Sequence, residues 1–269
     1  MPAKKKKSSL GLKILLVLII LLALSPFYYG YVLKFVVSNW RRLRDQNHYV
    51  SYPVYKSFHI RIPDKYSIYG VDVSFYQNKI NWQRVKKMHD GRIHISFAFI
   101  KATQGLLGID PYFQRNWSEA GKAGIIRGAY HYFNADKDGK WQARFCLQNV
   151  HLQPGDLPIV ADIEELRHAS PDQMRHRLKD FLEEIQAKTG MQPIIYTPLT
   201  FYQKYLMGYL DDYRFWIARY QQPELNTGAE TNWIFWQSAN RATVSGIPSI
   251  VDFNVFKGDS LAFRALLKK

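Results

Sequence analysis

The stretch Leu157-Pro158-Ile159-Val160-Ala161-Asp162-Ile163-Glu164 decides the fold class. Its apolar run is rich in branched residues and predicts a strand that is buried on both faces. Residues two apart on a strand point to the same face, so Asp162 and Glu164 are expected to project together, with Cα atoms roughly 6–7 Å apart. Paired acids at the carboxyl end of a buried parallel strand are typical of α/β active sites. A strand end with two solvated acids is the alternative.

A repeating strand–helix pattern surrounds this stretch from residue 69 onwards. Apolar runs predict strands over 69–75, 94–103, 126–133, 157–164, 193–197, 215–220, 234–238 and 250–256. Helical patterns lie between the early strands, over 82–89, 111–123, 141–150, 170–188 and 198–210. Eight strands interleaved with helices predict an α/β fold, a barrel of the TIM type. The helical pattern is weak after residue 210, so we expect the end of the barrel to be irregular, with antiparallel strands.

The composition limits the classes of protein and partner. With 47% hydrophobic and 22% charged residues in 269, most of the chain should be globular. A single cysteine, Cys146, excludes an internal disulfide and a cysteine-based zinc cluster. The formal charge is +15, of which residues 1–50 hold about half, and the remainder suits an anionic partner such as a cell-wall polymer. Nucleic acid is not expected, since basic residues are scattered among acids and no nucleic-acid motif is found.

The N-terminal segment predicts a membrane anchor. A run of four lysines at 4–7 precedes residues 14–33, a stretch of 20 residues without a charge, which is long enough to cross a bilayer. The alternative is a cleavable signal peptide, for which residues 14–24 would form the apolar region. We therefore expect a basic tail at 1–13, a transmembrane helix at 14–33, a stalk at 34–66 and a barrel at 67–269. Basic residues flank the helix almost equally on both sides, so the function of the barrel must decide whether the tail is cytoplasmic.

Polar side chains recur at the carboxyl ends of the predicted strands. They are Asp72 in the first strand, His131 in the third, Asp162 and Glu164 in the fourth, Tyr196 in the fifth, Gln237 in the seventh and Asp252 in the eighth. A barrel would bring all of these side chains to one mouth. One acid at a strand end is usually solvated or caps a helix, but four acids on three strands indicate a site.

Several motifs, in order, resemble glycoside hydrolase family 25 lysozymes. They include Gly70-Val71-Asp72-Val73-Ser74, Gly128-Ala129-Tyr130-His131-Tyr132-Phe133, Asp162-Ile163-Glu164 and Val251-Asp252-Phe253-Asn254. The resemblance covers about 69–258. It implies a modified barrel with eight strands and fewer than eight helices. It also implies hydrolysis of the β-1,4 bond between N-acetylmuramic acid and N-acetylglucosamine in peptidoglycan, with no metal and no cofactor.

The resemblance also implies roles for individual residues. Glu164 is similar to the general acid of the family, and Asp162 to the partner that stabilises the transition state or orients the acetamido group. Asp72 and Asp252 match the other acids of the cleft. Sugar contacts are expected from aromatic side chains, namely Tyr130, Tyr132, Tyr196 and Trp236. The family usually has a glutamate where this chain has Gln104, beside the same cleft, which removes one charge and affects the titration of the remaining acids.

Two other functions stay open. A non-catalytic peptidoglycan-binding module could keep the cleft, as the neutral Gln104 suggests. A metal-dependent deacetylase would need ligands, for which His131 is the only candidate at the strand ends. The expected partners are peptidoglycan strands and, through the N-terminal helix, a membrane; no protein partner is predicted. The protein is then expected in the cytoplasmic membrane as a single-pass protein, with the barrel outside the cytoplasm (periplasmic or cell-surface), or secreted if the N-terminal segment is cleaved.

Overall fold

The computed structural model describes Leu15, residues 52–228 and residues 231–269. The predicted transmembrane helix at 14–33 lies outside the described residues apart from Leu15, as do residues 34–51 of the predicted stalk. Among the residues that are described, no helix is both long enough and apolar enough to cross a bilayer. The membrane anchor therefore stays a prediction.

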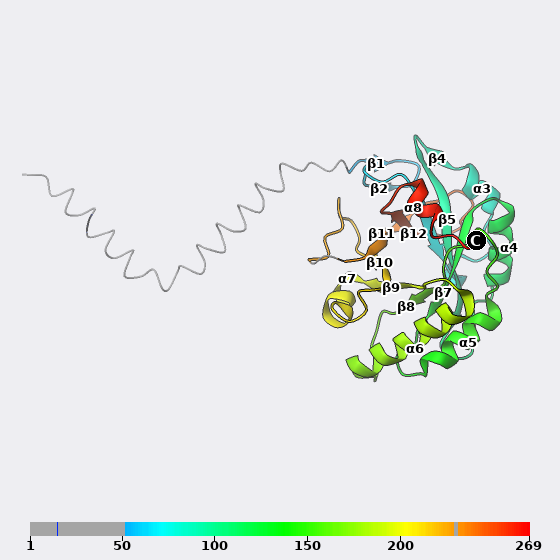
Figure 1. Cartoon of the computed structure of the whole chain (residues 1–269). Helices are drawn as coiled ribbons and strands as arrows, with labels where there is room; N and C mark the ends of the chain where they lie inside the picture. Colours follow the sequence, from blue (N-terminus) through cyan, green and yellow to red (C-terminus); the bar gives the residue numbers. More distant parts are fainter. Residues whose placement is uncertain (1–14, 16–51, 229–230) are drawn as a thin grey trace, which may run out of the picture. The chain divides into compact units, whose positions relative to one another are not determined.

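Eight strands close into a barrel (Figure 1). They are β3 (Tyr69–Val73), β5 (Ile93–Gln104), β7 (Ile126–Tyr132), β8 (Val160–Asp162), β9 (Ile194–Pro198), β10 (Arg214–Ala218), β11 (Trp233–Ala242) and β12 (Val251–Phe256). Each pairs with the next, and β3 also pairs with β12, which closes the ring. Every pair is parallel except the two made by β12, which runs antiparallel to β11 and to β3. The eight predicted strands and the antiparallel end of the barrel are confirmed.

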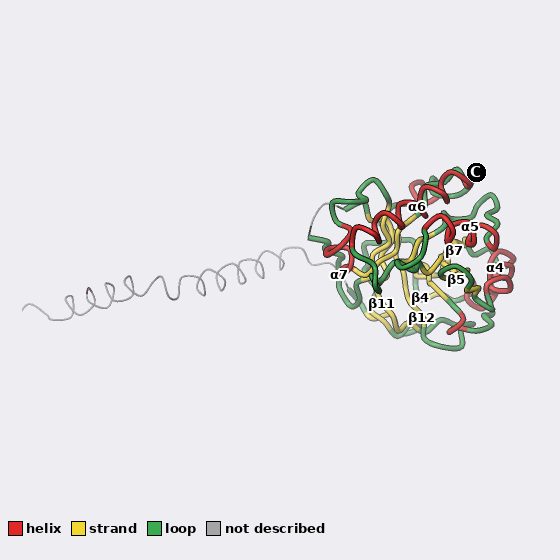
Figure 2. The backbone as a smooth tube through the Cα atoms, turned by 90° about the horizontal axis from the view of Figure 1, so that it is seen from below, coloured by secondary structure: helices red, strands yellow, loops and turns green. Residues whose placement is uncertain are grey.

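Helices follow the first five barrel strands and lie at the periphery of the sheet (Figure 2). They are α3 (Trp82–Lys87), α4 (Phe113–Lys122), α5 (Gly139–Asn149), α6 (Pro171–Thr189) and the short α7 (Leu199–Phe201), which continues as the π-helical turn η2 (Tyr202–Leu206). A single 3₁₀ turn, η1 (Phe75–Gln77), follows β3. In the described connections from β10 to β11 and from β11 to β12, no helix is found, as the weak sequence pattern predicts.

Aromatic side chains fill the interior of the barrel. Phe99 stacks on Trp216 with ring centroids 4.5 Å apart, and Phe97 contacts Phe235 at 5.1 Å. The two phenylalanines require glycine opposite them, because a Cβ at Gly70 would lie 2.5 Å from the ring of Phe97 and one at Gly128 would lie 2.5 Å from Phe99. A filled interior leaves room for a ligand only at the end of the barrel.

The C-terminal helix α8 (Ser260–Arg264) closes the amino-terminal end of the barrel. Its Phe263 lies 5.6 Å from Phe97 and 5.0 Å from Phe256, and Leu266 joins the same buried cluster. Lys268 then fixes the chain end, since its backbone N–H donates to Asp156. Ligands therefore have access at the opposite end, where the parallel strands finish.

A hairpin in front of the barrel changes the predicted domain boundary. Strands β1 (Val54–Tyr55) and β2 (Ile60–Arg61) pair with each other, and Phe58 and Ile62 are fully buried. Tyr66 packs against Trp236 of β11 at 6.0 Å between ring centroids. Residues 52–66, which we assigned to a stalk, thus extend the core of the barrel. The two prolines and mixed charge of this segment concealed the alternation of Phe58, Ile60 and Ile62, which is typical of a strand buried on one face.

Candidate active site

A cleft of about 210 Å³ lies at the mouth of the barrel. Alternation along each strand explains its lining: on β5, for example, Phe97 and Phe99 point into the barrel core, and Lys101 is the next residue on that face. The lining includes all four predicted acids, namely Asp72, Asp162, Glu164 and Asp252. The four acids therefore meet at one mouth, as predicted, but Asp252 lies near the amino end of β12 and not at a carboxyl end; it reaches the mouth because β12 is antiparallel to its neighbours. The structure adds a lysine to the acids.

Asp162 and Glu164 differ in their exposure. Asp162 is 5% exposed, and its Oδ1 has no hydrogen-bond donor among the described residues, whereas Glu164 is open to the cleft. Burial raises the pKa of Asp162 well above its usual range, and the neighbouring carboxyl of Glu164 raises it further. Burial also raises the pKa of Glu164. The pair therefore retains a proton to higher pH than isolated carboxyls do.

Asp72 is held at the base of the cleft by two amides. Its Oδ2 accepts hydrogen bonds from Nε2 of Gln237 at 2.9 Å and Nδ2 of Asn254 at 2.7 Å. Burial raises the pKa of Asp72 to about 6, although both amides oppose this shift. Burial, with the nearby charge of Asp72, raises the pKa of Asp252 to about 8. Asp72 and Asp252 face each other across the β3–β12 pair and share a hydrogen bond, so they form a second proton-holding pair.

Lys101 supplies the positive charge of the cleft. Its ammonium lowers the pKa of both Asp162 and Glu164, which opposes the effect of burial. Its Nζ also donates to Oε1 of Gln104 at 2.8 Å and lies 4.9 Å from the ring centroid of Tyr132. Gln104 is exposed and does not line the cleft itself. Its contact with the cleft is therefore through Lys101.

Three of the four predicted aromatic contacts line the cleft, namely Tyr130, Tyr132 and Tyr196. Trp236 does not: it points outward, packs against Tyr66, and donates its indole N–H to the carbonyl of Arg219 at 2.7 Å. The neighbouring Gln237 points inward, and alternation on β11 forces Trp236 to the other face. The prediction for Trp236 is wrong for this reason.

The tryptophan of the cleft is Trp216 on β10, which the sequence analysis missed. Its indole N–H donates to Oδ1 of Asn254 at 2.8 Å, so it also supports the residue that holds Asp72. The spacing of Trp216, Ala218 and Tyr220 carried the signal, since Trp216 and Ala218 share one face of β10 and Tyr220 continues the same spacing just after the strand. Tyr220 donates to Oε1 of Gln237 at 2.8 Å, as Tyr196 does.

His131 lies outside the cleft, because Tyr130 and Tyr132 on either side of it point inward. Its ring is buried, with Nδ1 2.8 Å from Oγ1 of Thr103 and Nε2 3.3 Å from Oε1 of Gln142. Burial lowers the pKa of His131 to about 4, so the ring is neutral near pH 7. Within residues 52–228 and 231–269, no group of three or more potential ligand side chains is placed to hold a metal ion.

Comparisons with known proteins agree with this arrangement. Residues 71–247 match the family model of glycosyl hydrolases family 25. The uncharacterized protein YegX of Escherichia coli K12 is 42% identical over 238 residues, covering 88% of this chain and 87% of that protein. Lysozyme M1 of Streptomyces globisporus is 34% identical over 218 residues, covering 76% of this chain and 72% of that protein.

Solved structures show the same fold. A family 25 glycosyl hydrolase from Bacillus anthracis has a TM-score of 0.69 and 31% identity, covering 79% of this chain and 98% of that chain. A lysozyme from Streptomyces coelicolor has a TM-score of 0.68 and 34% identity, covering 76% of this chain and 99% of that chain. With the family model matched over most of the barrel and the paired acids in its mouth, this chain belongs to glycosyl hydrolases family 25 and is a glycoside hydrolase of the lysozyme type.

Proposed function

We propose that the chain cleaves the β-1,4 bond between N-acetylmuramic acid and N-acetylglucosamine in peptidoglycan, with Glu164 as the general acid and Asp162 as its partner. The observation that carries this proposal is the pair itself: one carboxyl open to the cleft, the other buried beneath it, both with a raised pKa. Glycoside hydrolysis requires a proton donor and a group that stabilises positive charge at the sugar ring.

The two carboxyls suit different steps. Glu164 can reach the oxygen of the leaving sugar because its side chain is open to the cleft, and its raised pKa favours the protonated form that a general acid needs. Asp162 lies deeper, where its unpartnered Oδ1 can accept the N–H of the substrate's acetamido group. The negative charge of the pair then stabilises the oxocarbenium-like transition state.

The second pair would hold the sugar in place. Asp72 is fixed by two amide donors and by a hydrogen bond with Asp252, and both carboxyls line the cleft. Tyr130 and Tyr132 keep part of each ring exposed at the mouth, where a sugar ring can pack on it, whereas Trp216 is buried beneath them. Lys101 limits the rise in pKa of the catalytic pair, which favours ionisation of one of the two carboxyls.

The test is hydrolysis of purified cell walls by the wild type and by Glu164→Gln, followed as new reducing ends and as the masses of released muropeptides. Loss of the general acid should reduce kcat by about 10²- to 10⁴-fold. Glu183→Gln on α6 is the control, because Glu183 is exposed and far from the cleft in the fold. Full activity of Glu164→Gln would refute its role. No release of reducing ends by the wild type at any pH would favour a binding module.

The location of the protein follows from its substrate. Peptidoglycan lies outside the cytoplasmic membrane, so we place the basic tail inside, the 14–33 segment across the membrane and the barrel in the periplasm or at the cell surface, or the barrel in the medium if the segment is cleaved. Protease added to spheroplasts, or to intact cells if the barrel lies at the cell surface, should degrade the barrel. A barrel that stays protected in spheroplasts until the cytoplasmic membrane is lysed would refute this orientation.

A further inference from the structure

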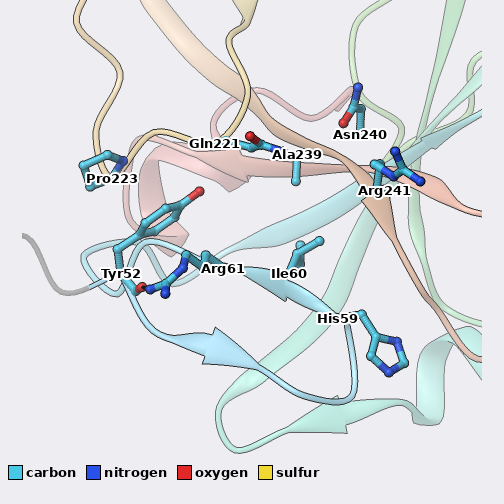
Figure 3. A pocket seen from close by; sticks show the side chains of 9 residues that line it. All are labelled: Tyr52, His59, Ile60, Arg61, Gln221, Pro223, Ala239, Asn240 and Arg241. Atoms are coloured by element: carbon cyan, nitrogen blue, oxygen red, sulfur yellow. Dashed lines mark hydrogen bonds between the residues drawn. The ribbon is translucent and has the colours of Figure 1, made fainter.

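A second cavity, larger than the active-site cleft, lies between the β1–β2 hairpin and the barrel. Its volume is about 660 Å³, within the usual range for pockets that bind small molecules. Figure 3 shows Tyr52, Ile60 and Arg61 of the hairpin segment on one side of this cavity and Gln221, Ala239 and Arg241 on the other. The family model begins at residue 71, so one wall of the pocket comes from a segment outside the matched range.

The lining of this pocket is cationic. It contains two arginines and one histidine, and no carboxylate is among the described residues that line it. Arg61 is fixed in place, because its Nη1 donates to the carbonyl of Tyr52 at 2.8 Å and its guanidinium lies 5.9 Å from the ring centroid of Tyr52. Arg241 is exposed and forms no ion pair within the described parts of the chain. Its donors are therefore available to an anionic ligand.

Two residues that line the pocket adopt an uncommon backbone conformation. His59 and Gln221 both line the pocket, with φ of 54° and 57°, in the left-handed region that residues other than glycine rarely adopt. Gln221 is kept there by its N–H, which donates to the carbonyl of Ser238 at 3.0 Å. Such conformations persist where the surrounding structure enforces them, and they occur often in ligand sites.

The pocket opens beside the active-site cleft. Gln237 belongs to the cleft and Ala239 to the pocket, and two residues of strand span roughly 7 Å. The loop after β10 connects the sites in the same way, because Tyr220 donates to Gln237 while its neighbour Gln221 lines the pocket. A ligand attached to a sugar in the cleft could therefore reach the pocket over the rim of the barrel.

We propose that this pocket binds an anionic group of the cell wall, namely a carboxylate of the short peptide carried by the muramic acid residues. The proposal rests on the proposed function, since it takes the peptide-bearing glycan as the substrate. Guanidinium groups pair with carboxylates through two parallel hydrogen bonds, and they bind phosphates by the same chemistry. A phosphate is therefore the other possible source of the anion, and the test must separate the two.

The test compares the full chain with Arg241→Gln on two substrates, glycan strands with their peptides and the same strands from which the peptides have been removed. We expect the wild type to have a lower KM for the peptide-bearing strands, and Arg241→Gln to raise that KM about tenfold, a typical loss for one charge-assisted contact. Its kcat, and its KM for stripped strands, should be unchanged. Arg264→Gln on α8, an exposed arginine at the other end of the barrel, is the control.

Direct binding keeps this test separate from the test of catalysis. Titration of the full chain with the free wall peptide, and in a parallel arm with inorganic phosphate, measures the pocket even if no hydrolysis is found. Peptide binding that is weakened by Arg241→Gln supports the proposal. If the chain binds phosphate but not the peptide, the pocket is an anion site, but the peptide is refuted as its ligand. Equal KM for both substrates, together with no binding of either anion, would overturn it.

Discussion

The Asp252 carboxyl makes stability depend on pH in a direction opposite to that of most acids. Its pKa is raised from 3.8 to about 8, so the folded protein holds a proton that the unfolded chain has already released above pH 4. The contribution of Asp252 to stability is then greatest below pH 4 and falls as the pH rises toward 8, because the folded state holds this extra proton throughout that range. Asp252→Asn removes this proton while keeping the shape of the side chain.

The magnitude follows from the proton count. For each pH unit over which the folded state holds one extra proton, the free energy of unfolding falls by about 1.4 kcal/mol. Between pH 5 and pH 7, the free energy of unfolding of the wild type should therefore fall by about 2 to 3 kcal/mol relative to that of Asp252→Asn. For a domain of this size, that difference corresponds to a change of about 5 to 10 °C in Tm. The variant should therefore melt at a higher temperature at pH 7, with a smaller advantage at pH 5.

Thermal melts followed by circular dichroism at pH 5, 6 and 7 measure this effect. Asp212→Asn is the matched control, since Asp212 is exposed after η2 and should leave the pH dependence as it is in the wild type. Parallel pH profiles for Asp252→Asn and the wild type would show that Asp252 holds no extra proton in the folded state. A greater advantage at pH 5 than at pH 7 would reverse the sign and would equally refute the reasoning.

Two further predictions concern the cleft and the core. Lys101→Met removes an ammonium that lowers the pKa of Asp162 and Glu164, so the pH profile of kcat/KM should move about one unit to higher pH. Lys101→Arg keeps the positive charge and should leave the profile in place. A shift of the Lys101→Met profile to lower pH would contradict this reasoning. Phe99→Ala removes the ring that stacks on Trp216 and should lower the free energy of unfolding by about 3 to 5 kcal/mol, measured by unfolding in urea. A loss below about 1 kcal/mol would show that the barrel interior is not closely packed.

The sequence predicted the strands well because each is a continuous apolar run. Their position near strand ends also placed Asp72, Asp162 and Asp252 at one mouth. The errors arose where a face could not be assigned: Trp236 on β11 and His131 near the end of β7 each have inward-pointing neighbours, and so face outward. Lys101 and Trp216 are on inward faces, and they were missed because a lysine or tryptophan in an apolar run gives no sign of a cleft without the register of the neighbouring strands.

The hairpin at 52–66 was hidden for another reason. Its apolar residues are few, and its strands have only two residues each, too short for a periodic pattern to identify. It is stable because Phe58 packs on Phe253 of β12, a contact between segments almost 200 residues apart in the sequence. The alternation of Phe58, Ile60 and Ile62 was the only local signal of the hairpin, and it does not show where the segment packs, so the pocket beside it could not be predicted from the sequence.

Closure of the barrel by β12 makes the cleft depend on packing between distant parts of the chain. Asp72 comes from the first barrel strand and Asp252 from the last, and the barrel core also includes Phe263 and Leu266 from the segment after β12. A chain folded only as far as β11 would have neither this acid pair nor the seal that α8 gives the core. Because contacts between segments so far apart in sequence form slowly, we expect the cleft to be completed late in folding, when β12 pairs with β3.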